Sequence, residues 1–96
     1  MYARLAIIPV ESGMRSRMQK LDDQVATLYK AQKGFKSVTF LEDDAVDEHG
    51  SFSLWETKED AEAAGAIGVS VLRENASDIL KGPPTIRWFE VYEPKA

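Results

Sequence analysis

The chain has 96 residues and a net charge of −4, with 12 basic and 16 acidic residues spread along it. This length fits one domain over residues 1–96, and the acidic balance without a basic cluster argues against nucleic-acid binding. The chain has no cysteine, which excludes disulfides, thiolate metal sites and a cysteine nucleophile.

The N-terminal residues predict a β-strand. Residues 2–10, YARLAIIPV, are rich in aliphatic residues, and the period of two places apolar side chains on both faces. The segment lacks the basic start of a signal peptide. The longest mild apolar run, residues 63–72, is about half of the ~20 residues that a membrane span needs. We therefore expect a cytoplasmic protein that does not bind membranes.

The next segment, residues 13–33, predicts an amphipathic helix. Its apolar stripe follows a 4,3,4,3 spacing through Met14, Met18, Leu21, Val25 and Leu28. Ser12 fits the N-cap, and Gly34 fits the left-handed residue that ends many helices. The other face is expected to be solvated and carries Arg15, Lys20, Asp22, Asp23 and Lys30.

The second half of the chain predicts a hairpin, a helix and a last strand. Residues 35–42 and 51–55 are the expected hairpin strands, joined by DDAVDEHG. Thr57 is the expected N-cap of a helix that starts at Lys58, in which Gly65 and Gly68 indicate close packing. Residues 85–93, TIRWFEVYE, are the expected last strand, again apolar on both faces.

The order of these elements predicts an α+β fold, the ferredoxin-like βαββαβ arrangement with a four-stranded antiparallel sheet. Two helices cover only one face of such a sheet, so the other apolar face needs a different cover. The simplest cover is the same face of a second copy, which predicts a homodimer through the open sheet face.

The chain resembles the antibiotic biosynthesis monooxygenase-like family of the dimeric α+β barrel superfamily. The resemblance rests on the opening MYAR, the GF that starts the second strand, the junction LWETKEDAEAA, and the ending RENASDILKGPPTIRWFEVYE. It implies a homodimer whose two sheets form a barrel, with a pocket between the helices and the sheet of each protomer. The activities known in such pockets include cofactor-free oxygenation of polycyclic phenols or quinol precursors, and oxidative haem degradation.

The haem-degrading branch of the family can be tested residue by residue. That branch uses an Asn on the first strand and a Trp and a His on the second helix. This chain offers Ala6 or Ile7 on the strand and Ala63 on the helix, while its only Asn and only His are Asn75 and His49. The comparison argues against haem degradation and favours a protein without cofactor.

Trp55 and Arg73 are the candidate catalytic residues, each with a plain structural alternative. Trp55 could wall an aromatic pocket and donate its indole N–H, or fill the core where the third strand meets the second helix. Arg73 could stabilise an enolate or phenolate, or sit at a helix end where the dipole favours a cation. Three more aromatic residues could line a pocket, the core or the dimer interface: Tyr29, Trp88 and Tyr92.

His49 and the neighbouring acids carry no expected chemistry. His49 lies in DEHGS, where we expect an exposed hairpin tip, which argues against a catalytic triad. The acids do not match the spacing of a calcium-binding loop, so we expect a solvated turn and no metal site. These acids are Glu42, Asp43, Asp44, Asp47 and Glu48.

Two functions from different classes remain open. The first is a cofactor-independent monooxygenase that acts on a small aromatic or enolisable substrate. The alternative is a non-catalytic homodimeric module that binds a small apolar or aromatic ligand or a partner protein. Oxygen uptake would distinguish them, because only the first consumes oxygen.

Overall fold

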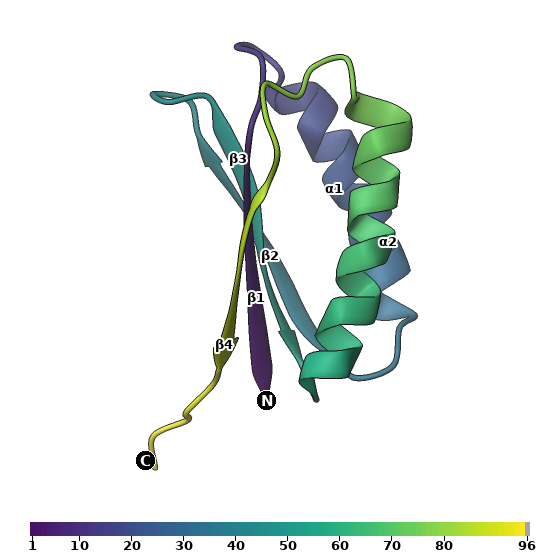
Figure 1. Ribbon diagram of the computed structural model, residues 1–96, viewed down its shortest axis with the longest axis vertical. Helices are drawn as coiled ribbons and strands as arrows, with labels where there is room; N and C mark the ends of the chain where they lie inside the picture. The colour runs from purple at the N-terminus through teal and green to yellow at the C-terminus, as the bar shows by residue number, and fades with distance from the viewer. Residues whose placement is uncertain (96) are drawn as a thin grey trace.

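The computed structural model describes residues 1–95, which form an antiparallel sheet with two helices packed on one of its faces (Figure 1). The elements follow one another as β1, α1, β2, β3, α2 and β4, and the sheet order is β2-β3-β1-β4. This confirms the predicted ferredoxin-like fold. The bounds are β1 Tyr2–Pro9, α1 Arg15–Lys30, β2 Phe35–Asp43, β3 Glu48–Trp55, α2 Lys58–Ala76 and β4 Thr85–Glu90.

The sheet register decides which side chains meet the helices. β1 lies between β3 and β4, and Ala6 pairs with Ser51 on one side and Ile86 on the other. Because side chains alternate along a strand, Arg4, Ala6 and Ile8 share the face toward the helices. We call this the inner face, and the opposite one the outer face.

Helix α2 begins as the sequence predicts, whereas α1 is shorter than predicted. The side chain of Thr57 accepts a hydrogen bond of 3.1 Å from the backbone N–H of Asp60. Helix α1 starts after Met14 without a side-chain cap, so the expected Ser12 cap is wrong. The helix ends at Lys30, and Gly34 adopts the expected left-handed conformation with φ +80° beyond a turn that replaces the last predicted residues.

The core lies between the inner face and the two helices. Trp55 and Tyr29 are fully buried at its centre, and their rings meet edge to face with centroids 5.2 Å apart. Small residues of α2, Ala61 and Ala64, are also fully buried and let this helix approach the sheet closely. Burial of these apolar surfaces is the main stabilising contribution to the fold.

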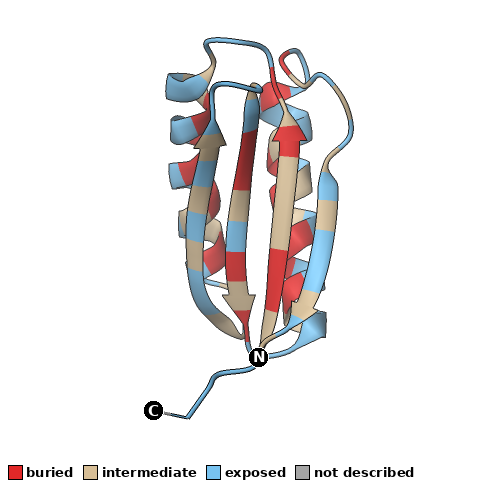
Figure 2. Cartoon of the chain, turned by 90° about the vertical axis from the view of Figure 1, so that its left-hand side faces the viewer, coloured by how far each residue is buried: buried red, intermediate tan, exposed pale blue. Residues whose placement is uncertain are grey.

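The outer face is mainly apolar, although it also carries Arg87 opposite Leu5, and no segment of residues 1–95 packs across it (Figure 2). Leu5 pairs with Phe52 across β1 and β3, and Phe52 is 37% exposed. Leu41 on β2 is exposed as well. The predicted uncovered sheet face is therefore present in the protomer.

Candidate functional site

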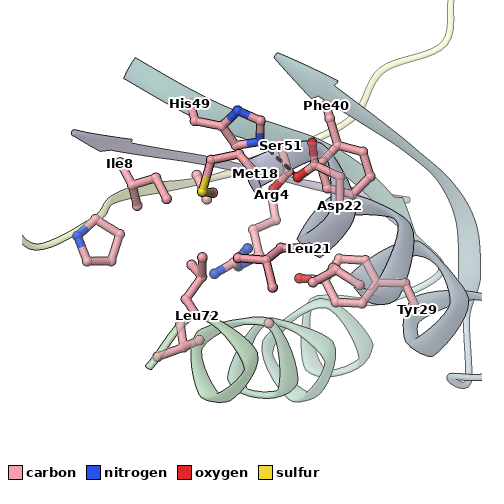
Figure 3. Close-up of a pocket in the computed structure, with 16 residues that line it drawn as sticks. Arg4, Ile8, Met18, Leu21, Asp22, Tyr29, Phe40, His49, Ser51 and Leu72 are labelled. Atoms are coloured by element: carbon pink, nitrogen blue, oxygen red, sulfur yellow. Dashed lines mark hydrogen bonds and ion pairs between the residues drawn. The ribbon is translucent and has the colours of Figure 1, made fainter. Parts of the chain in front are cut away.

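A cavity of about 60 Å³ lies between the inner face and the two helices (Figure 3). We call it the inner cavity. Its wall is mainly apolar and includes Ile8, Met18, Leu21, Val25, Phe40 and Leu72. The polar side chains that reach it are Arg4, Asp22, Tyr29, His49 and Ser51.

The size of the inner cavity limits what it can hold. A volume of about 60 Å³ accommodates roughly four water-sized molecules. Pockets that enclose whole organic ligands are usually ~300–1,000 Å³. The inner cavity can therefore enclose a reacting group or small molecules, but not a complete polycyclic compound.

His49 is buried in this wall, with 5% of its surface exposed. Its Nε2 lies 2.8 Å from Oδ1 of Asp22 on α1. The expectation of an exposed hairpin tip is wrong, because β3 begins at Glu48 and His49 pairs with Ile8 of β1, facing the helices. The period of two that joins His49 to Ser51, Ser53 and Trp55 was the available signal.

Asp22 also departs from its expected place on the solvated face of α1. It follows Met18 by four residues, so it lies on the same side of the helix and points toward the sheet. Desolvation raises the pKa of the Asp22 carboxyl, and the hydrogen bond from His49 offsets only part of that effect. A buried carboxylate with a raised pKa beside an imidazole is a pair suited to accept a proton.

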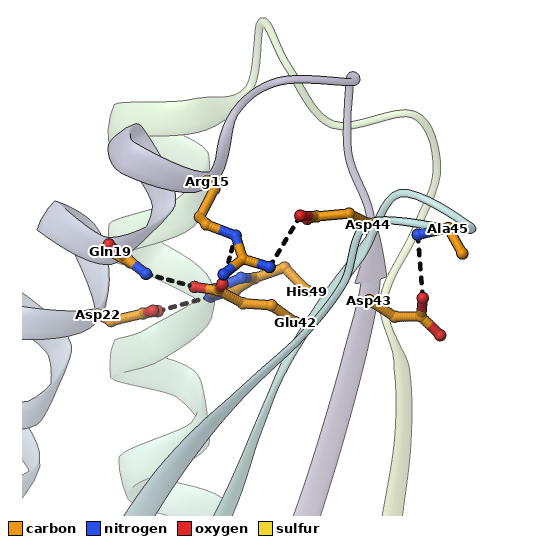
Figure 4. Close-up of polar contacts among 8 residues, drawn as sticks. All are labelled: Arg15, Gln19, Asp22, Glu42, Asp43, Asp44, Ala45 and His49. Carbon is orange, nitrogen blue, oxygen red and sulfur yellow. Dashed lines mark hydrogen bonds and ion pairs between the residues drawn. The ribbon is translucent and has the colours of Figure 1, made fainter.

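Glu42 lies at the edge of the same cluster (Figure 4). One carboxylate oxygen of Asp22 and of Glu42 and a ring nitrogen of His49 lie within 4.8 Å of one another. Glu42, however, already pairs with Arg15 at 2.8 Å and accepts a hydrogen bond of 3.0 Å from Gln19. The three ligand atoms could hold a divalent ion only if Arg15 moved away.

Arg4 enters the inner cavity from β1 and was not among the sequence candidates. It is 4% exposed, and its Nε has no hydrogen-bond partner among residues 1–95. Its guanidinium carbon lies 5.6 Å from the ring centroid of Trp88. Burial raises the pKa of Tyr29, and the charge of Arg4 opposes this change in part. The signal in the sequence was one cation inside the apolar run YARLAIIPV.

The two glycines of α2 fit around these polar side chains. A Cβ at position 65 would lie 2.6 Å from Nε of Arg4. A Cβ at position 68 would lie 2.6 Å from the hydroxyl oxygen of Tyr29. The close packing predicted from Gly65 and Gly68 is confirmed, and the structure identifies Arg4 and Tyr29 as what α2 packs against.

Trp55 and Arg73 lie apart from the inner cavity and from each other. Trp55 contacts Tyr29 and Phe35 edge to face in the core and does not line the cavity. Arg73 is exposed on α2 and lines a separate open groove of about 400 Å³ between α2 and β4. We call this the α2–β4 groove. Of the other aromatic candidates, Tyr29 lines the inner cavity, Trp88 lines the groove, and Tyr92 is exposed.

Solved structures share this fold along the whole chain. A candidate antibiotic biosynthesis monooxygenase from Nitrosomonas europaea has a TM-score of 0.82 at 12% identity, covering 99% of this chain and 93% of that one. A candidate of the same kind from Deinococcus radiodurans has a TM-score of 0.74 at 11% identity, covering 100% and 97%. SnoaB, a cofactor-independent oxygenase from Streptomyces nogalater, has a TM-score of 0.73 at 14% identity, covering 97% and 94%.

The resemblance found in the sequence is therefore confirmed at the level of fold: this chain folds like antibiotic biosynthesis monooxygenase structures. No family model matches the sequence, and no curated protein matches it. Neither helix of residues 1–95 combines the length and apolar character required to cross a bilayer.

Proposed function

We propose that this protein is a cofactor-independent monooxygenase that acts on a small aromatic or enolisable substrate at the inner cavity. The observation that carries the proposal is the buried pair of His49 and Asp22 in the cavity wall. The fold shared with SnoaB, described as a cofactor-independent oxygenase, supports the same reaction class.

The pair supplies the proton acceptor that this chemistry needs. A CH₂ group activated by an adjacent ring or carbonyl loses a proton to Asp22 and His49, which share it across their 2.8 Å contact. The resulting carbanion adds O₂, and the proton returns to form a hydroperoxide. Loss of water then leaves a ketone, so one oxygen atom enters the product, the other leaves as water, and no external reductant is consumed.

The apolar wall of the inner cavity favours this sequence. It excludes bulk water from the carbanion and strengthens electrostatic interactions with the few polar groups present. Its limited volume suits the reacting edge of a substrate together with O₂, while the rest of the substrate lies outside the cavity.

We also propose that the working protein is a homodimer in which the outer faces of two sheets meet. The apolar outer face, with Leu5 and Phe52 paired at its centre, supports this assembly. The family resemblance implies the same arrangement. A cytoplasmic location stays a prediction from the sequence.

The alternative is a non-catalytic module that binds a small ligand. It is favoured by the exposed position of Arg73 and the core position of Trp55, which place neither candidate at the inner cavity. In this alternative the pair of His49 and Asp22 joins β3 to α1 and has no chemical role.

Oxygen uptake by the purified protein distinguishes the two functions. We expect uptake with anthrone-type or quinol-type compounds, with one oxygen atom from ¹⁸O₂ in the product. Asp22→Asn should slow turnover by about 10²-fold or more, the usual contribution of a general base. Asp23→Asn, an exposed neighbour on α1, is the matched control. Absence of uptake across the panel, or an unchanged rate in Asp22→Asn, would overturn the proposal.

A further inference from the structure

We infer that Arg4 is the anchor of an anion-binding site in the α2–β4 groove, and that its ligand is a planar aromatic or enolic carboxylate. The inference concerns binding and stands whether or not the inner cavity is catalytic. It assigns a class of ligand to Arg4, whose positive charge has no partner in the core.

Arg4 is a cation without a counter-ion, and its side chain is buried except where it lines the groove. Among residues 1–95, no carboxylate forms an ion pair with it, whereas Arg15 and Arg17 on α1 both pair with acids. Removing an arginine from water without a partner costs several kcal/mol, so buried charges are normally paired. The guanidinium carbon of Arg4 lies 5.6 Å from the centroid of the Trp88 ring, and this cation–π contact offsets only ~0.5–2 kcal/mol of the desolvation cost. An anionic ligand is the partner that is missing.

The position of Arg4 indicates where that ligand lies. Among residues 1–95, Arg4 and Val69 alone line both the inner cavity and the α2–β4 groove, so Arg4 forms part of the wall between them. The groove, about 400 Å³, lies within the usual size range of small-molecule sites. A ligand in the groove can therefore place its anionic end on Arg4, beside the inner cavity.

The lining of the groove favours a flat ligand. Trp88 is 36% exposed and offers an aromatic surface on the β4 side. On the α2 side, Gly65 and Ala66 leave room for a ring. Arg73 adds a second cation at the groove and Glu62 adds one anion, so the lining carries more positive than negative groups.

Gly65 is an independent sign that α2 is built around the guanidinium. Any side chain there would place its Cβ 2.6 Å from Nε of Arg4 and displace it. Glycine in a helix costs about 1 kcal/mol relative to alanine. Planar carboxylates match the guanidinium fork with two parallel hydrogen bonds, which monatomic anions such as chloride cannot form.

Calorimetry and thermal unfolding at low ionic strength test the inference with benzoate and salicylate as probes. Both should bind and raise Tm in proportion to ln(concentration) once the site is saturated, while benzamide, which has the same shape without the charge, should not. Inorganic sulfate also pairs with a guanidinium but has no ring to lie against Trp88, so it should bind more weakly than either carboxylate. If benzamide binds as well as benzoate, if sulfate binds better than either carboxylate, or if no carboxylate binds, the inference is overturned.

Variants connect the binding to Arg4. Arg4→Met should weaken benzoate at least tenfold, and Arg4→Lys should weaken it less, because the charge remains and the two-pronged geometry is lost. Gly65→Ala should also weaken binding, because its Cβ displaces the guanidinium. Lys20→Met, which removes an exposed cation on α1, is the control and should bind normally.

The stability of the unliganded variants separates a binding role from a packing role. If the charge of Arg4 is held for a ligand, Arg4→Met removes an uncompensated buried cation and should be at least as stable as the wild type. A Tm of Arg4→Met below those of the wild type and Lys20→Met would show that Arg4 stabilises the core and would overturn the inference. These measurements of binding and stability do not depend on oxygen consumption. Their outcome therefore tests the anion site independently of the proposed oxygenase activity.

Discussion

His49 donates to or accepts from Asp22 across 2.8 Å, and this buried contact joins β3 to α1. Burial raises the pKa of the Asp22 carboxyl, and the contact with His49 opposes that shift only in part. A group whose pKa is higher in the folded state favours folding when it is protonated. The stabilising contribution of Asp22 is therefore complete below its unfolded pKa of about 3.9 and is lost as pH rises through the folded value.

The first prediction concerns Asp22→Asn, which keeps an oxygen near His49 but cannot ionise. We expect the variant to be more stable than the wild type at pH 7.5, because the wild type must hold a desolvated carboxylate there. The difference in free energy of unfolding between Asp22→Asn and the wild type should shrink toward pH 3.5, where the wild-type carboxyl is largely protonated. Urea unfolding at both pH values measures the difference.

The control for this prediction is Asp23→Asn, whose carboxyl is exposed on the same helix. Asp23→Asn should be no more stable than the wild type at pH 7.5. The prediction is contradicted if Asp22→Asn is less stable than the wild type at neutral pH. Asp22→Ala serves as a second comparison and should lose about 1–3 kcal/mol, because Nε2 of His49 is then left buried without its partner.

The fold could be predicted from the sequence because it depends on local periodicity. The 4,3,4,3 stripe through Met18 and Val25 identifies α1, and the alternation in TIRWFEVYE identifies β4, without knowledge of distant residues. The predicted end of that strand at residue 93 is wrong, because β4 ends at Glu90. The Thr57 cap is equally local, since its hydrogen bond reaches only to Asp60.

The candidate site could not be predicted in the same way, because long-range pairing creates it. β3 extends back to Glu48 only because β1 and β2 pair with it, through Ile8 and Glu42 opposite His49. The segment DEHGS has no apolar alternation of its own, and only the period of two that continues back from Trp55 connects His49 to the strand. The unpaired state of Arg4 is likewise a property of the folded core, because any of the acids in the sequence could have been its partner.

The second prediction concerns Trp55. Trp55→Ala should lower the free energy of unfolding by about 3–5 kcal/mol, because it removes a fully buried ring that contacts Tyr29 and Phe35. Trp88→Ala, at the partly exposed edge of the sheet, should lose less than half as much. Denaturant unfolding of both variants measures the difference.

Trp55→Phe separates a packing role from a binding role. Nε1 of Trp55 has no hydrogen-bond partner among residues 1–95, so losing the indole N–H removes no hydrogen bond. We expect this variant to keep the affinity of the wild type for benzoate and its rate of oxygen uptake. A large loss of benzoate affinity or of oxygen uptake in a folded Trp55→Phe variant would show that Trp55 is part of the functional site.

The third prediction concerns Gly68. Replacing a glycine inside a helix by alanine normally raises the free energy of unfolding by about 1 kcal/mol. Here the new Cβ would lie 2.6 Å from the hydroxyl oxygen of Tyr29, whose ring is fixed against Trp55. We expect Gly68→Ala to lower the free energy of unfolding by about 1–3 kcal/mol, the usual cost of overpacking a core.

A double-mutant cycle tests this cause. Tyr29→Phe removes the oxygen that meets the new methyl group, so Gly68→Ala should cost less in the Tyr29→Phe background than in the wild type. Equal costs in the two backgrounds would show that the clash with Tyr29 is not the reason for the loss.

The fourth prediction concerns the outer face of the sheet. If two copies meet there, Phe52→Asp places a charge opposite Leu5 at the centre of the interface, where burial of an unpaired carboxylate is costly. The dimer dissociation constant should rise by about 30-fold or more, equivalent to about 2 kcal/mol. Val46→Asp introduces the same charge in the exposed turn between β2 and β3 and should leave association unchanged. Sedimentation velocity across micromolar concentrations measures both variants. A wild-type protein that sediments as a monomer, or equal association of the two variants, would contradict the proposed dimer.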